Sequence, residues 1–68
     1  MSPQIRLTHK DVPFAVSESD EPGYYQVWFQ IGDQTFYSKT ETKLAGLAVR
    51  RARGFIDRKL REFRASNA

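Results

Sequence analysis

Apolar and polar side chains alternate along two neighbouring stretches in the middle of the chain, which predicts two β-strands. The stretches cover residues 24–31 and 34–39, and the Gly32-Asp33 pair between them is typical of a two-residue hairpin turn. Such a turn fixes the register, because each step back along one strand is matched by a step along the other. The predicted cross-strand pairs are Ile31 with Gln34, Gln30 with Thr35, Phe29 with Phe36, Trp28 with Tyr37, and Val27 with Ser38.

Because successive side chains of a strand point to opposite sides, this hairpin has two unlike faces. One face is nearly all apolar and is expected in the core: Tyr25, Val27, Phe29, Ile31 and Phe36. The other is expected to recognise a partner, since it combines aromatic rings with hydrogen-bonding groups and one cation: Tyr24, Gln26, Trp28, Gln30, Thr35, Tyr37 and Lys39. Alternatively, Trp28 and Tyr37 form a cross-strand pair that stabilises the sheet by a few tenths to about 1 kcal/mol.

A third strand is predicted before the hairpin, over residues 12–17, because apolar and polar positions alternate there as well. Pro13 cannot donate a ladder hydrogen bond, which favours an edge position in the sheet for this strand. Pro22-Gly23 supplies strong turn chemistry between this strand and the hairpin. The alternation over residues 4–8 allows an additional short strand at the N-terminal end.

After Lys39 the spacing of apolar residues changes from two to nearly 3.6, which predicts a long amphipathic helix over about 41–64. Thr40 is a suitable N-cap, and Ser38 with Glu41 fits a capping box that starts the helix earlier. The predicted fold is therefore α+β, a three-stranded antiparallel meander packed by one C-terminal helix (βββα), in one domain over residues 1–68. The predicted core places Leu44, Ala48, Phe55, Ile56 and Leu60 over Val12, Phe14, Val16, Val27, Phe29, Ile31 and Phe36.

Composition narrows the classes of function. The 68 residues include no cysteine and one histidine, so we expect no disulfide framework, no metal site and no cofactor. No apolar run approaches the roughly 20 residues of a membrane span, and the N-terminus lacks the apolar centre of a signal peptide, which predicts a cytoplasmic protein without membrane contact. A Gly-rich phosphate loop and a nucleophile with an adjacent base are both missing, so we expect no catalytic residues and no enzyme activity.

The formal charge of +3 is concentrated in the C-terminal part, since nine of the eleven Lys and Arg residues lie between residues 38 and 68. At about 100° per residue, most of these cations fall on the helix face opposite the apolar stripe, where Asp57 and, toward the flank, Glu62 are the acids. A solvated helix face of the ordinary kind is the alternative, but such a face mixes acids with bases. The predicted nucleic-acid-binding residues are Lys39, Lys43, Arg50, Arg53, Arg61 and Arg64.

The stretch from Gly23 to about Ile56 resembles the βββα arm-type DNA-binding domain of phage integrases, which is akin to the plant AP2 domain. The resemblance is carried by Gly23-Tyr24-Tyr25, the Gly32-Asp33 turn, and Lys39-Thr40-Glu41-Thr42. In that family the sheet face away from the helix enters the DNA major groove, which implies a recognition role for Tyr24, Gln26, Trp28, Gln30, Thr35, Tyr37 and Lys39. Family members usually carry several Arg or Lys on these strands, whereas this chain carries only Lys39. The element order also resembles the partial-RNase-H-type antitoxin fold, although the usual Pro-Gly-Cys element of that family is not present.

Two functions follow as expectations. The first is a small non-catalytic nucleic-acid-binding module, with DNA preferred, whose basic helix face contacts phosphates while the sheet face reads or stacks on bases. The second is a protein-interaction or regulatory module, dimeric in one version, that uses the aromatic plate of Tyr24, Trp28 and Tyr37 as a hot-spot surface. The helix face and the open sheet face are expected to point in opposite directions. The excess of cations on the helix favours the first function.

Overall fold

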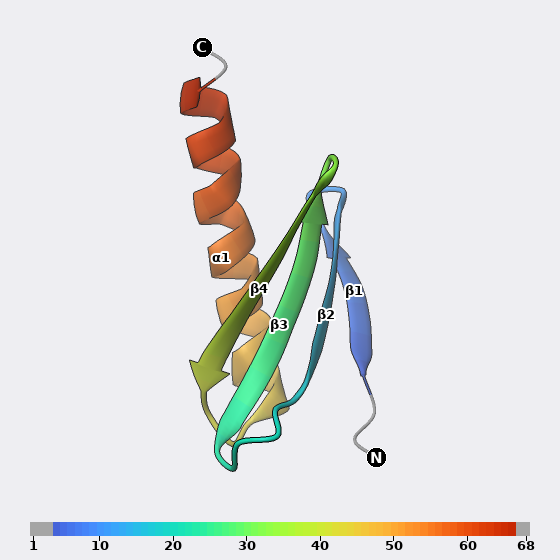
Figure 1. Cartoon of the computed structure of the whole chain (residues 1–68), viewed down its shortest axis with the longest axis vertical. Coiled ribbons are helices and arrows are strands. Elements are labelled where there is room, and N and C mark those ends of the chain that lie inside the picture. Colours follow the sequence, from blue (N-terminus) through green and yellow to red (C-terminus); the bar gives the residue numbers. More distant parts are fainter. Residues whose placement is uncertain (1–3, 67–68) are drawn as a thin grey trace.

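The chain forms a four-stranded antiparallel sheet with one long helix packed against one of its faces (Figure 1). The structure is a computed structural model, and it describes residues 4–66. The α+β class and the antiparallel meander followed by a C-terminal helix are confirmed. The elements are β1 (Ile5–His9), β2 (Val12–Glu18), β3 (Tyr24–Ile31), β4 (Gln34–Glu41) and α1 (Ala45–Ser66).

The sheet has four strands and not the three of the predicted meander, because the additional short strand allowed at 4–8 is present as β1 and pairs with β2. The edge position predicted for the strand that contains Pro13 was wrong, since β2 lies between β1 and β3. The interior position is tolerated because Pro13 lies opposite Thr8 on β1, whereas the β2–β3 pairing begins only at Phe14. Pro13 therefore needs no N–H donor towards β3.

The turn between β1 and β2 is made by Lys10 and Asp11, whose φ angles of 51° and 66° lie in the left-handed region. A two-residue hairpin turn with positive φ at both positions matches the twist of the flanking strands. The pairs that normally signal this turn are Asn-Gly, Asp-Gly and Gly-Gly, and Lys10-Asp11 is none of them. The sequence therefore indicates a possible short strand over 4–8, but it does not predict that this strand pairs with β2.

The β3–β4 hairpin forms with the predicted register. β3 has the predicted bounds, and Gly32 adopts a φ of 59° in the turn. On the core side, the rings of Phe29 and Phe36 stack with their centroids 5.1 Å apart. All five predicted pairs are present, namely Ile31–Gln34, Gln30–Thr35, Phe29–Phe36, Trp28–Tyr37 and Val27–Ser38.

The helix begins at Ala45, so the predicted start near residue 41 was wrong. The reason is that β4 continues to pair with β3 as far as Glu41, which keeps this segment extended. The first turn is organised by Thr42, whose Oγ1 accepts a hydrogen bond from the Leu44 N–H at 3.0 Å. The Leu44 carbonyl in turn accepts a bond from the Ala48 N–H at 3.1 Å. The two residues predicted as caps lie inside the strand: Ser38 and Thr40.

The core lies between α1 and the inner strands of the sheet. Its buried members are Val12, Phe14, Val16, Val27, Phe29, Ala48, Ala52 and Ile56. Leu44 was predicted in this core but is 66% exposed, because it precedes the first helical turn. One helix does not cover the outer strands completely, and Leu7 on β1 remains 37% exposed. No helix within residues 4–66 is long and apolar enough to cross a membrane.

Candidate nucleic-acid interface

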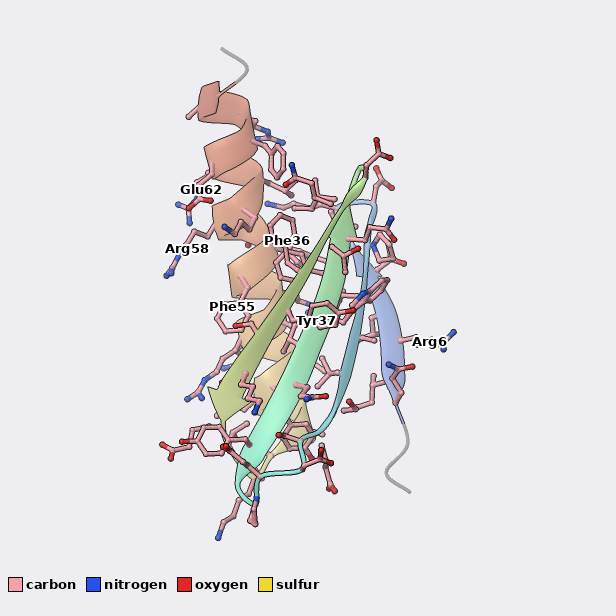
Figure 2. The ribbon with its side chains drawn as sticks, in the orientation of Figure 1. Arg6, Phe36, Tyr37, Phe55, Arg58 and Glu62 are labelled. Atoms are coloured by element: carbon pink, nitrogen blue, oxygen red, sulfur yellow. The ribbon has the colours of Figure 1, made fainter. Side chains whose placement is uncertain are left out.

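The outward side of α1 carries a line of exposed arginines. At a rise of about 1.5 Å per residue, the first and the last of them lie about 21 Å apart along the helix axis. Figure 2 shows the neighbouring side chains of Arg58 and Glu62 projecting away from the sheet on the same helix. We call the four arginines the basic strip: Arg50, Arg53, Arg61 and Arg64.

Two lysines predicted as part of the same surface lie elsewhere. Lys43 is in the segment that precedes α1 and is exposed there. Lys39 lies on β4, opposite Gln26, and therefore on the open side of the sheet. Its Nζ atom is 4.0 Å from Glu21 Oε1. The structure thus brings together the four helix arginines but neither of these lysines.

Both acids of α1 are engaged in ion pairs with groups outside the basic strip. Asp57 Oδ1 lies 2.9 Å from His9 Nε2 and 3.0 Å from Lys10 Nζ. Glu62 Oε2 lies 3.2 Å from Lys59 Nζ. Within residues 4–66, no side chain of the basic strip takes part in an ion pair or a hydrogen bond. The guanidinium groups of the strip are therefore available to an anionic partner.

The β1–β2 turn adds a cation to this surface. Lys10 borders a hollow of about 320 Å³ together with Asp57, Leu60, Arg61 and Arg64. Lys10 was not among the predicted site residues, because its position next to α1 depends on a hairpin for which the sequence gives no clear signal. The bond between His9 and Asp57 shows that this hairpin and the helix meet across 48 positions of the sequence.

Arg51 differs from the arginines of the basic strip, because it fastens the helix to the sheet. Its Nη1 atom donates hydrogen bonds to Thr40 Oγ1 and to the Glu41 carbonyl, both at 2.8 Å. Thr40 is buried, and buried hydroxyl groups require a hydrogen-bond partner. Arg51 therefore stabilises the junction between α1 and the end of β4 and is not assigned to the interface.

The ion pairs of Asp57 predict a pH dependence of stability. Hydrogen bonds from His9 and then from Lys10 lower the pKa of Asp57 below its ordinary value of 3.8. The stability linked to a lowered carboxyl pKa is present above the ordinary value and is lost as the pH falls through the folded-state value. We expect the urea midpoint of the wild type to fall more steeply below about pH 4 than that of Asp57→Asn, with the two midpoints converging in stronger acid. Urea unfolding followed by circular dichroism checks this, and midpoints that stay a constant distance apart would contradict it.

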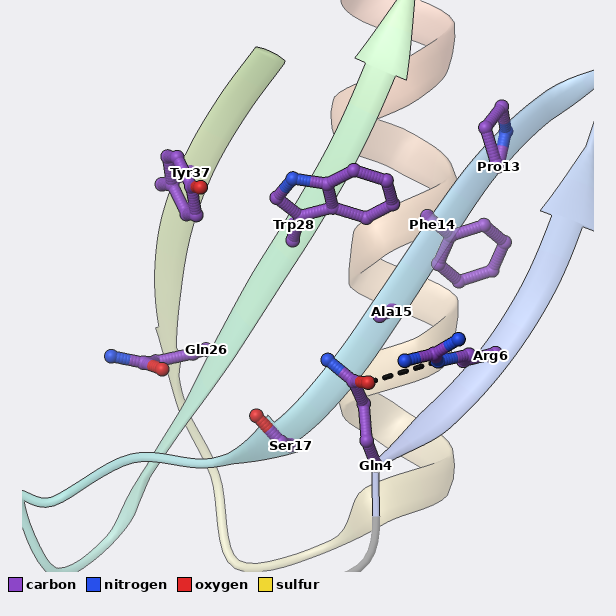
Figure 3. Close-up of a pocket in the computed structure, with 9 residues that line it drawn as sticks. All are labelled: Gln4, Arg6, Pro13, Phe14, Ala15, Ser17, Gln26, Trp28 and Tyr37. Carbon is purple, nitrogen blue, oxygen red and sulfur yellow. Dashed lines mark hydrogen bonds between the residues drawn. The ribbon is translucent and has the colours of Figure 1, made fainter.

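The open face of the sheet carries a row of four cross-strand neighbours, Arg6, Ala15, Trp28 and Tyr37, one from each strand. Figure 3 shows the guanidinium of Arg6 and the indole of Trp28 directed toward β2 from opposite sides. Ala15, on β2 between them in the register, is only 4% exposed although it faces away from α1. Tyr37, at the end of the row, is 79% exposed.

These residues border a hollow of about 510 Å³, a volume within the range of roughly 300–1,000 Å³ that is common for ligand pockets. We call it the open-face hollow. Three of the seven predicted sheet-face residues border it: Gln26, Trp28 and Tyr37. Its full lining is Gln4, Arg6, Pro13, Phe14, Ala15, Ser17, Gln26, Trp28 and Tyr37 (Figure 3).

The other four predicted sheet-face residues do not border the open-face hollow: Tyr24, Gln30, Thr35 and Lys39. Tyr24 lies opposite Glu41, whose carboxylate raises the pKa of the tyrosine hydroxyl. The Nε2 atom of Gln30 donates to the Gly32 carbonyl at 3.3 Å, within the hairpin turn. In their place β1, the residue that precedes it, and β2 supply polar residues that were not predicted, because their position depends on the register of the β1–β2 hairpin. These are Gln4, Arg6 and Ser17.

No cluster of three His, Cys, Asp or Glu side chains that could hold a metal ion occurs in the part of the chain that the structure describes. Comparison of the chain with protein-family models, with curated proteins and with solved structures found no match. The resemblance to the arm-type DNA-binding domain therefore stays a prediction.

Proposed function

We propose that the protein is a small nucleic-acid-binding module that contacts phosphate groups through the basic strip. The observation that carries this proposal is the pairing pattern of α1: both acids are held by His9, Lys10 and Lys59, while the four strip arginines are exposed and have no ion-pair partner among residues 4–66. On an ordinary solvated helix face, acids and bases are interspersed. Here Asp57 lies between Arg53 and Arg61 on the same side of α1, but its carboxylate is paired with His9 and Lys10. The strip arginines therefore keep their charge for an anionic partner.

Guanidinium groups suit this role because their planar array of donors matches phosphate oxygens. Each strand of B-DNA presents one phosphate per roughly 3.4 Å of helix axis, so a strip about 21 Å long can reach several phosphates at once. Lys10 extends the cationic surface beside Arg61 and Arg64. We therefore propose duplex DNA as the partner and expect the four arginines to make most of the phosphate contacts.

Fluorescence anisotropy of a labelled duplex, titrated with the protein over a series of salt concentrations, tests the proposal. Each phosphate contact releases counterions and contributes about −0.9 to the slope of log K against log salt concentration, so four contacts predict a slope of about −3 to −4. A second duplex of unrelated sequence serves as a control and should give the same slope, because phosphates carry no sequence information. Binding that does not depend on salt, or no binding at low salt, would contradict the proposal.

A further inference from the structure

We propose that the open-face hollow binds unpaired bases of a single-stranded nucleic acid. This inference rests on the proposed function and adds to it a second contact surface for a different form of the ligand. α1 packs on one face of the sheet and the hollow lies on the other, so the two surfaces point in opposite directions (Figures 1 and 3). A duplex held by the basic strip therefore does not block the hollow.

The aromatic rings of the hollow are available for stacking. Within residues 4–66, the ring pairs are formed by Phe29, Phe36 and Phe63 on the side of the sheet that faces α1. In the same range, Trp28 and Tyr37 take part in no such pair although they lie opposite each other in the register. Their role is therefore not the ring-to-ring stabilisation of the sheet, and their π-faces can receive planar ligands. Bases stack on such side chains with little dependence on sequence.

The polar groups at the rim suit the edges of nucleobases. Gln26 and Gln4 each offer donors and an acceptor, and Ser17 adds a hydroxyl group (Figure 3). Amide side chains can form paired hydrogen bonds with base edges. Arg6 Nε donates to Gln4 Oε1 at 3.0 Å, which orients the guanidinium toward β2 and leaves its terminal nitrogens for a phosphate or for stacking.

The dimensions and the charge of the open face favour a nucleic-acid strand over a single nucleotide as the ligand. Neighbouring strands lie about 4.8 Å apart, so the row from Arg6 to Tyr37 spans about 14 Å, enough for more than one nucleotide. The cations on this face are Arg6 and Lys39; Lys39 lies 4.0 Å from Glu21, and Glu41 lies at the far end opposite Tyr24. Arg6, which borders the hollow, is therefore the cation that an anionic nucleic-acid strand would meet there. In a duplex the faces of the bases are covered by stacking, so the ligand is single-stranded.

Trp28 is the only tryptophan of the chain, and its fluorescence therefore reports directly on the hollow. We expect a short oligothymidine to quench this fluorescence to saturation. Tyr37→Ala should raise the Kd for the oligothymidine on the order of 5- to 100-fold, which corresponds to the loss of one stacked base, and leave the Kd for a duplex unchanged. Thr8→Ala is the matched control, since Thr8 is exposed on the same face of the sheet but does not border the hollow. Circular dichroism should show both variants folded, because both side chains are exposed.

The outcomes separate this inference from the proposed function. If the duplex binds with a steep salt dependence but oligothymidine leaves Trp28 fluorescence unchanged, the proposal that the hollow binds unpaired bases is overturned. The proposed function of the basic strip then stands. If neither ligand binds, both are overturned. Sedimentation adds a further outcome: a concentration-dependent dimer that Tyr37→Ala dissociates would assign the open face to a second copy of the chain, and would also overturn the inference.

Discussion

Phe14→Ala is expected to remove most of the folding stability of this protein. Phe14 is 1% exposed and lies on β2 opposite Phe29, in the centre of the core beneath α1. Truncation of a buried phenylalanine to alanine costs about 3–5 kcal/mol, because the apolar burial of the ring is removed and a cavity remains. Small domains have a total free energy of unfolding of only about 5–15 kcal/mol, and a chain of this size is expected near the lower end. Urea unfolding followed by circular dichroism should show a large decrease of the midpoint.

Phe63→Ala is the matched control for this effect, because it removes the same side chain from the end of the helix. Phe63 is half-buried and packs edge-on against Phe36, with ring centroids 6.4 Å apart. An aromatic pair of this kind contributes about 0.5–1.5 kcal/mol beyond its buried area, so the midpoint should shift much less. Equal midpoint shifts for the two variants would show that the stability does not depend on the packing between β2 and α1.

The central hairpin could be predicted because its determinants are local. Strict alternation sets the faces of β3 and β4, and the Gly32 turn sets the register, so no distant residue is needed. β1 could not be placed in the same way. Its turn uses Lys10 and Asp11 at positive φ, and Lys10 is held by an ion pair with Asp57 on the helix. The start of α1 depended on the length of β4, which is fixed by pairing with β3 rather than by the capping residues of the helix.

For the two candidate surfaces as well, the sequence predicts the local features but not the contacts between distant segments. Helical periodicity alone places the arginines of the basic strip on the outside of α1, as observed. Periodicity does not show that Asp57 is already paired with groups from the β1–β2 hairpin, and this pairing is what leaves the strip cationic. Likewise, alternation predicts that Trp28 and Tyr37 share a face, whereas the approach of Arg6 depends on the register of β1 against β2. The chemistry of each surface therefore depends on interactions between segments that are far apart in the sequence.

Replacing all four arginines of the basic strip by glutamine is expected to abolish most duplex binding. The slope of log K against log salt concentration is negative, and each arginine that no longer neutralises a phosphate should reduce its magnitude by about 0.9. The slope should therefore change from about −4 to near zero. The affinity at low salt should fall on the order of 100- to 1,000-fold, since phosphate neutralisation supplies most of the binding free energy. Anisotropy titrations of the duplex over the same salt series measure both quantities.

Single variants distinguish binding through the basic strip from binding that depends only on the net charge of the protein. Arg53→Gln and Arg58→Gln each remove one exposed positive charge from α1, but Arg58 lies about 100° around the helix from the middle of the basic strip. Arg53→Gln should reduce the magnitude of the salt slope by about 1, whereas Arg58→Gln should leave the slope unchanged. Neither side chain packs in the core, so both variants should keep the stability of the wild type. If the two variants reduce the slope equally, binding depends on total charge, and the strip is not the phosphate-contacting surface.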